Sequence, residues 1–178
     1  MSENTASTPQ DVPRFELKRL SEEAIASALD KAMRYRLLNE PGDAESICLD
    51  VLDVEPDNQQ ALVTLLLAMT DRFAKGYAVG DAQIREILSR LGDEYERRYY
   101  AGVACERRGK LALAQGLPGS NSTAYERLRE GMDWFEKAEA IRPPGNDDAI
   151  LRWNTCARII MRNRLAPRQE QEFEPPLE

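Results

Sequence analysis

Apolar side chains recur along this chain at helical spacing, and prolines separate the segments that carry them. Ile84, Ile87 and Leu91, for example, lie three or four residues apart and therefore share one face of a helix. The prolines fall between such segments or in the end regions, as expected because a proline inside a helix costs about 3 kcal/mol. The pattern predicts about seven helices and no substantial sheet, over residues 22–38, 44–54, 59–73, a short helix ending at 92, 93–115, 123–141 and 147–163.

Polar residues mark where several of these helices are expected to begin. Ser21 precedes two glutamates and is predicted to cap the first helix. Thr123 and Glu126 have the spacing of a capping box, which predicts that the sixth helix begins at Thr123. Asp147 and Asp148 favour the start of the last helix, and this role explains the carboxylate pair without a metal ion.

The helical segments also repeat. Ala32 and Ala44 are small residues on two consecutive helices, where an antiparallel pair can approach closely. One hairpin cannot bury its remaining apolar face, so a further hairpin is expected to stack on it. The spacing of Ala44, Cys48, Val51, Leu52 and Pro56 returns at Gly80, Ile84, Ile87, Leu88 and Gly92, and returns in part at Gly131, Phe135, Ala138 and Pro143.

The third unit is longer than the first. Gly102 and Gly131 take the small positions there and are separated by 17 residues more than Ala32 and Ala44. Such an insertion predicts a hairpin whose helices are each about two turns longer, joined through residues 116–122. Gly102 and Gly131 are expected to face each other with no room for a branched side chain.

The first and third units resemble tetratricopeptide repeats. Ala32 and Tyr35 match the first helix of that motif, and DAESICLDVLDVEPDN (43–58) matches its second helix and exit turn. GMDWFEKAEAIRP (131–143) is a second strong match, whereas the middle unit has Leu66 at a small position and no closing proline. The resemblance implies an all-α fold of stacked antiparallel helix hairpins, forming a short right-handed α-solenoid with units at about 25–58, 59–92 and 93–145 and a capping helix at 147–163.

Composition and charge limit the partners that this domain could have. We expect one folded domain at 16–164 between disordered segments at 1–15 and 165–178, the latter acidic. The net charge of −7 argues against nucleic acid and anionic lipid, and the longest apolar run, Ala61–Met69, is about half the length that crosses a bilayer. The first residues have no secretory pattern, so a cytoplasmic location is expected.

The usual chemistry-bearing residues are missing or scattered. The chain has no histidine, the commonest general base and metal ligand. Cys48, Cys105 and Cys156 lie far apart on apolar helical faces, which predicts inert reduced thiols. Arginines on the last helix, Arg152 among them, and the charged residues between 94 and 110 are interpreted as solvated surface with pairs four residues apart. We therefore expect no enzyme activity, no cofactor and no metal site.

The resemblance to tetratricopeptide repeats also implies where a partner would bind. In that family the first helices of successive hairpins line a concave groove that receives a peptide or helix. The corresponding side chains here are mostly apolar, and they are expected to bind another protein or peptide segment. They are Leu29, Met33, Arg36, Val63, Leu67, Thr70, Tyr99, Val103 and Glu106.

Two alternatives to a peptide-binding adaptor or assembly factor remain open at this stage. The nine residues could pack only against one another or against the chain's own tail. In the structural alternative, the groove or the long hairpin packs on a second copy of the chain, without a separate peptide ligand. A catalytic function, the weakest alternative, would have to use carboxylates and tyrosines alone.

Overall fold

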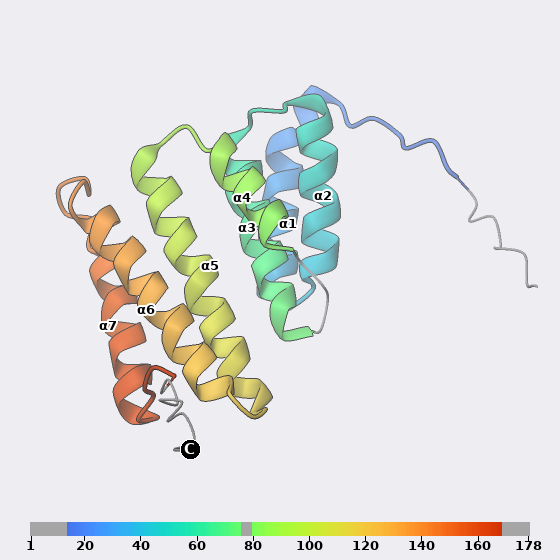
Figure 1. The fold of residues 1–178 in the computed structure, drawn as a ribbon. Helices are drawn as coiled ribbons and strands as arrows, with labels where there is room; N and C mark the ends of the chain where they lie inside the picture. Colours follow the sequence, from blue (N-terminus) through green and yellow to red (C-terminus); the bar gives the residue numbers. More distant parts are fainter. Residues whose placement is uncertain (1–13, 76–79, 169–178) are drawn as a thin grey trace, which may run out of the picture.

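The computed structural model describes residues 14–75 and 80–168, and within these ranges every regular element is helical (Figure 1). The prediction of an all-α fold is therefore confirmed for the described residues. Predictions for 1–13 and 169–178 lie outside them. The helices are α1 (Ile25–Leu37), α2 (Pro41–Val54), α3 (Gln59–Asp71), α4 (Asp81–Arg90), α5 (Glu94–Gln115), α6 (Ser120–Glu139) and α7 (Asp148–Arg162), with short 3-10 helices at Glu22–Ala24 and Arg72–Lys75.

Consecutive helices pack as pairs, and alternate helices also touch. α1 packs on α2, α2 on α3, α5 on α6 and α6 on α7. In addition α1 contacts α3, α3 contacts α5, and α5 contacts α7. One apolar core lies mainly among α1 to α4 and a second among α5 to α7 (Figure 1). The small positions Ala32 and Ala44 are fully buried, as their place between paired helices requires.

Glycines set the close approach of the two longest helices, α5 and α6. A Cβ atom at Gly131 would lie 3.2 Å from the carbonyl oxygen of Gly102, so the predicted contact between these glycines is confirmed. A Cβ atom at Gly102 would lie only 2.5 Å from the ring of Phe135. Gly109 adds a contact that the repeat pattern did not predict, because its Cβ would lie 2.8 Å from Leu128 Cγ.

Three predicted helix starts need correction. The side chain of Ser21 makes no capping hydrogen bond. α6 begins at Ser120, so Thr123 lies inside the helix. Gly119, the residue before the helix, has a φ of 82°. The Ser120 hydroxyl accepts a hydrogen bond of 3.0 Å from the Leu117 N–H. α2 begins three residues earlier than predicted, at Pro41, because proline suits the first helical position, where no N–H donor is needed.

The caps that do form use an amide and a carboxylate. The Asn58 side chain accepts from the Ala61 N–H at 2.9 Å at the start of α3. The Asp93 side chain accepts from the Glu96 N–H at 2.8 Å at the start of α5. Each cap satisfies a backbone donor that the first helical turn leaves unpaired.

The described residues also correct the predicted boundary of the C-terminal segment. Leu165 is buried against the second core, although the sequence placed it in a disordered tail. Residues 166–168 are exposed and not helical. No helix in the described ranges is long and apolar enough to cross a membrane.

Candidate functional site

The nine predicted partner-binding residues lie on α1, α3 and α5, but not all of them reach the surface. Leu29, Thr70, Val103 and Glu106 are buried. Because Leu29 and Val103 belong to the two cores, they cannot line an open groove without a rearrangement. The remaining five are at least partly exposed; they are Met33, Arg36, Val63, Leu67 and Tyr99.

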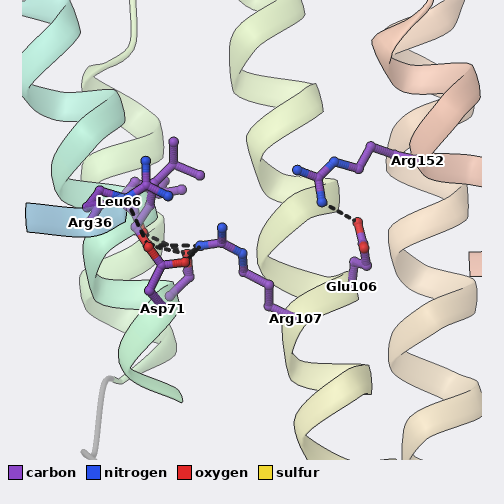
Figure 2. Close-up of polar contacts among 8 residues, drawn as sticks. Arg36, Leu66, Asp71, Glu106, Arg107 and Arg152 are labelled. Atoms are coloured by element: carbon purple, nitrogen blue, oxygen red, sulfur yellow. Dashed lines mark hydrogen bonds and ion pairs between the residues drawn. The ribbon is translucent and has the colours of Figure 1, made fainter. Parts of the chain in front are cut away.

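Charged side chains from four helices meet on this face and form what we call the charged belt. Its members are contributed by α1, α3, α5 and α7, the helices that begin successive hairpins or follow the last one (Figure 2). They are Arg36, Asp71, Glu106, Arg107, Lys110 and Arg152.

Asp71 joins three helices at one end of the charged belt. One carboxylate oxygen accepts from Arg36 Nε at 2.9 Å and the other pairs with Arg107 at 2.8 Å, as Figure 2 shows. Arg107 also donates to the carbonyl oxygen of Leu67 at 2.8 Å and to the hydroxyl of Thr70. Burial lowers the pKa of Arg107, although the nearby Asp71 carboxylate opposes that shift.

Glu106 joins the charged side chains at the other end of the charged belt. Its side chain is fully buried, and its carboxylate accepts from Lys110 on the same helix and from Arg152 on α7 at 3.1 Å. Arg152 Nε also lies 3.3 Å from the hydroxyl of Tyr99, to which it donates. Burial disfavours the charge on Arg152. The hydrogen bond to Tyr99 and the Glu106 carboxylate outweigh this effect, so the pKa of Arg152 is raised.

The charged belt carries more positive than negative charge. Four cationic side chains share two carboxylates, Asp71 and Glu106, on a chain whose net charge is −7. Beside it, a hollow of about 380 Å³ opens between α3 and α5. Its walls include Arg107, Lys110, Phe73 and Leu111, so cationic and apolar groups face the same space.

The sequence pattern does not predict most of this arrangement. Lys110 does pair with Glu106 four residues away, as the spacing predicted. Arg107 and Arg152, in contrast, were interpreted as solvated surface, but they are partly buried and bond to other helices. The pairs Arg107–Asp71 and Arg152–Glu106 join residues 36 and 46 positions apart, and no local spacing rule detects such pairs.

The cysteines and aromatic residues in the described part of the chain lie in packed surroundings. Burial raises the pKa of Cys48, Cys105 and Cys156 to about 12 each, so at neutral pH these thiols are protonated. Tyr95 stacks on Tyr99, with 5.8 Å between ring centroids. Among the residues described, no group of three or more cysteines and carboxylates could hold a metal ion.

Comparisons of the chain with protein-family models, curated proteins and solved structures found no match.

Proposed function

We propose that this chain is a short right-handed α-solenoid of hairpins similar to tetratricopeptide repeats, and that it binds an acidic segment of a partner protein at the charged belt. It acts as an adaptor or assembly factor in the cytoplasm, without catalysis or cofactor. The stacking of α1, α3, α5 and α7 along one face supports this arrangement.

One observation supports the proposal most strongly: the excess of cations on the charged belt. Asp71 and Glu106 are each already paired with two cationic groups. Lys110 and Arg152 nevertheless keep 44% and 34% of their side-chain surface exposed. A carboxylate from a partner could therefore approach them without displacing the internal pairs.

Charge alone would give such a complex little affinity. A solvent-exposed ion pair contributes about 0–1 kcal/mol, whereas association costs several kcal/mol of lost freedom. Apolar contacts must supply the rest, and Met33, Val63 and Leu67 lie partly exposed on the helices of the same face. The preferred ligand is thus an acidic segment that also carries apolar side chains.

Site-specific photo-crosslinking tests where the partner lies. A benzophenone amino acid would replace Met33 or Val63 on the proposed face and, as a control, Leu49, which is 52% exposed on α2. We expect the same partner protein to crosslink in cells from the positions of Met33 and Val63 but not from that of Leu49. Crosslinks from Leu49 alone, or from none of the three, would contradict the proposed site.

A second candidate function is self-association through α7. Leu151 and Met161 on this helix are 62% and 68% exposed, and no other described helix follows α7 to cover them. If a second copy covers this face, light scattering coupled to gel filtration should give twice the mass of the chain. The variant Leu151→Glu with Met161→Glu should then return it to the monomer mass.

A further inference from the structure

A second hollow lies on the opposite face of α5 from the charged belt. Arg97 and Arg98 lie four and three positions before Ala101 and share this face with it, whereas belt residues Glu106 and Lys110 occupy the other. The hollow measures about 480 Å³, and an adjoining one of about 170 Å³ shares several of its walls. We call the two together the α4–α6 groove; its shared lining residues are Arg85, Leu88, Ala101 and Trp134.

The helices explain why the groove exists. α5 contacts both α4 and α6 and lies between them in Figure 1. α5 lines the groove with the small side chains of Ala101, Ala104 and Cys105, which leave space between the walls, and Arg108 from the same helix adds a cation. Leu88 from α4 and Trp134 from α6 form apolar walls. Because α4 has ten residues, the groove extends for about 15 Å, the length of about three helical turns.

The rim of the groove is cationic. Five arginines and three carboxylates line the two hollows, on a chain that is negative overall. Arg98, Arg108 and Arg127 pair with those carboxylates. Arg97 donates to the carbonyl oxygens of Leu91 and Gly92, and the exposed Arg85 has no hydrogen bond or ion pair within the described residues.

We propose that the α4–α6 groove is a second docking site, which takes an acidic amphipathic helix from a partner protein. A large apolar side chain of that helix packs between Leu88 and Trp134, and its flanking carboxylates pair with Arg85 and Arg97. Two helical walls over a floor of alanines suit a helix, which would bury its apolar face there. Arg85 and Arg97 have no ion pair in the part of the chain that the structure describes, and they select acidic over basic sequences.

The proposal goes beyond the function of the charged belt, since the two faces can bind independently. Peptide display on the full chain tests it. A library of random peptides, long enough for about four helical turns, would be selected on the wild-type protein and then measured against variants. The variants are Arg85→Glu and Trp134→Ala in the groove, Lys110→Gln in the charged belt, and Arg158→Glu as a charge-matched control on exposed α7 residue Arg158.

The expected peptides are acidic and carry a large apolar residue. Arg85→Glu should weaken their binding about tenfold or more, because an ion pair becomes a contact between like charges. Arg158→Glu and Lys110→Gln should leave it unchanged. Since Arg85 is exposed and has no ion pair with any described residue, its variant should fold even if Trp134→Ala does not.

Three results would overturn the proposal. The first is a selection that enriches no acidic peptides. The second is a selection in which Arg85→Glu weakens none of the acidic peptides, since peptides bound at the charged belt are weakened by Lys110→Gln instead. The third is selection of sequences that match the chain's own acidic residues 170–178, which would assign the groove to that segment instead of a partner.

Discussion

Glycine at position 102 allows the ring of Phe135 to lie directly against the backbone of α5. A methyl group there would come within 2.5 Å of that ring, which is fully buried in the core. Alanine is the better helix former by about 1 kcal/mol, but overpacking a core costs about 1–3 kcal/mol. The steric cost is therefore expected to exceed the gain in helix propensity.

We predict that Gly102→Ala lowers the free energy of unfolding by about 1–2 kcal/mol in urea denaturation, and that Gly131→Val lowers it by about 1–3 kcal/mol. Gly42→Ala provides the control, because nothing lies within 4 Å of the added methyl group on α2. That substitution should leave stability unchanged or raise it slightly. Equal effects of Gly102→Ala and Gly42→Ala would show that the close packing of α5 and α6 is misplaced.

The buried thiols predict how stability depends on pH. Folding raises the pKa of Cys48, Cys105 and Cys156 from 9.0 to about 12, so the folded chain holds these protons more tightly than the unfolded chain. Their contribution is complete below pH 9 and is lost as the pH rises from 9 towards 12. Each thiol adds a slope of up to about 1.4 kcal/mol per pH unit.

Urea denaturation across this range should show a falling free energy of unfolding. The triple variant with alanine at all three cysteines should flatten the slope, although Tyr100 will retain part of it because burial raises its pKa to about 12. An unchanged slope in the triple variant would mean that the thiols titrate normally in the folded protein.

At the scale of helices, Glu106 links α5 to α7. Breaking a buried ion pair typically costs about 3–5 kcal/mol, but here Lys110 and Arg152 are partly exposed and can recover water. Glu106→Gln should therefore destabilise the protein by about 1–3 kcal/mol in thermal or urea unfolding.

An exposed ion pair on α6 is the matched control for that change. Arg129 and Asp133 lie 3.2 Å apart with 39% and 55% of their side chains exposed. Asp133→Asn removes the same charge and should cost less than about 1 kcal/mol. If Glu106→Gln cost no more than Asp133→Asn, the carboxylate would not be holding α7 to α5.

Helices and close contacts could be predicted from local pattern, but the charged belt could not. Ala32, Ala44, Gly102 and Gly131 were identified because small residues recur at fixed spacing between apolar ones. The start of α6 was misplaced because Thr123 and Glu126 have capping-box spacing, yet Gly119 and Ser120 form the turn. The charged belt depends on which distant helices become neighbours, and single-helix patterns do not contain that information.

At the scale of the molecule, α1, α5 and α7 bring cations to one face of an acidic chain, and α3 contributes the Asp71 carboxylate to the same face. Asp71 and Glu106 hold these cations in place across α1, α3, α5 and α7. Repeat architectures commonly use such continuous faces for binding. We therefore propose the charged belt as the binding surface, with the internal ion pairs as its support.

A charge-matched comparison of partner capture shows whether the charged belt binds the partner. The belt variant combines Met33→Glu with Lys110→Gln, both at exposed positions on the proposed face. The control variant combines Leu49→Glu with Lys31→Gln. Both residues are exposed and lie outside the set proposed to bind, and the two substitutions change the net charge by the same amount as those of the belt variant.

Each variant would be purified from cells with its bound proteins, which are quantified by mass spectrometry, and its melting temperature would be measured. We predict that the belt variant loses partners that the wild type and the control both retain, while both variants melt within a few degrees of the wild type. A folded belt variant that retains the same partners in the same amounts would show that the charged belt does not bind them.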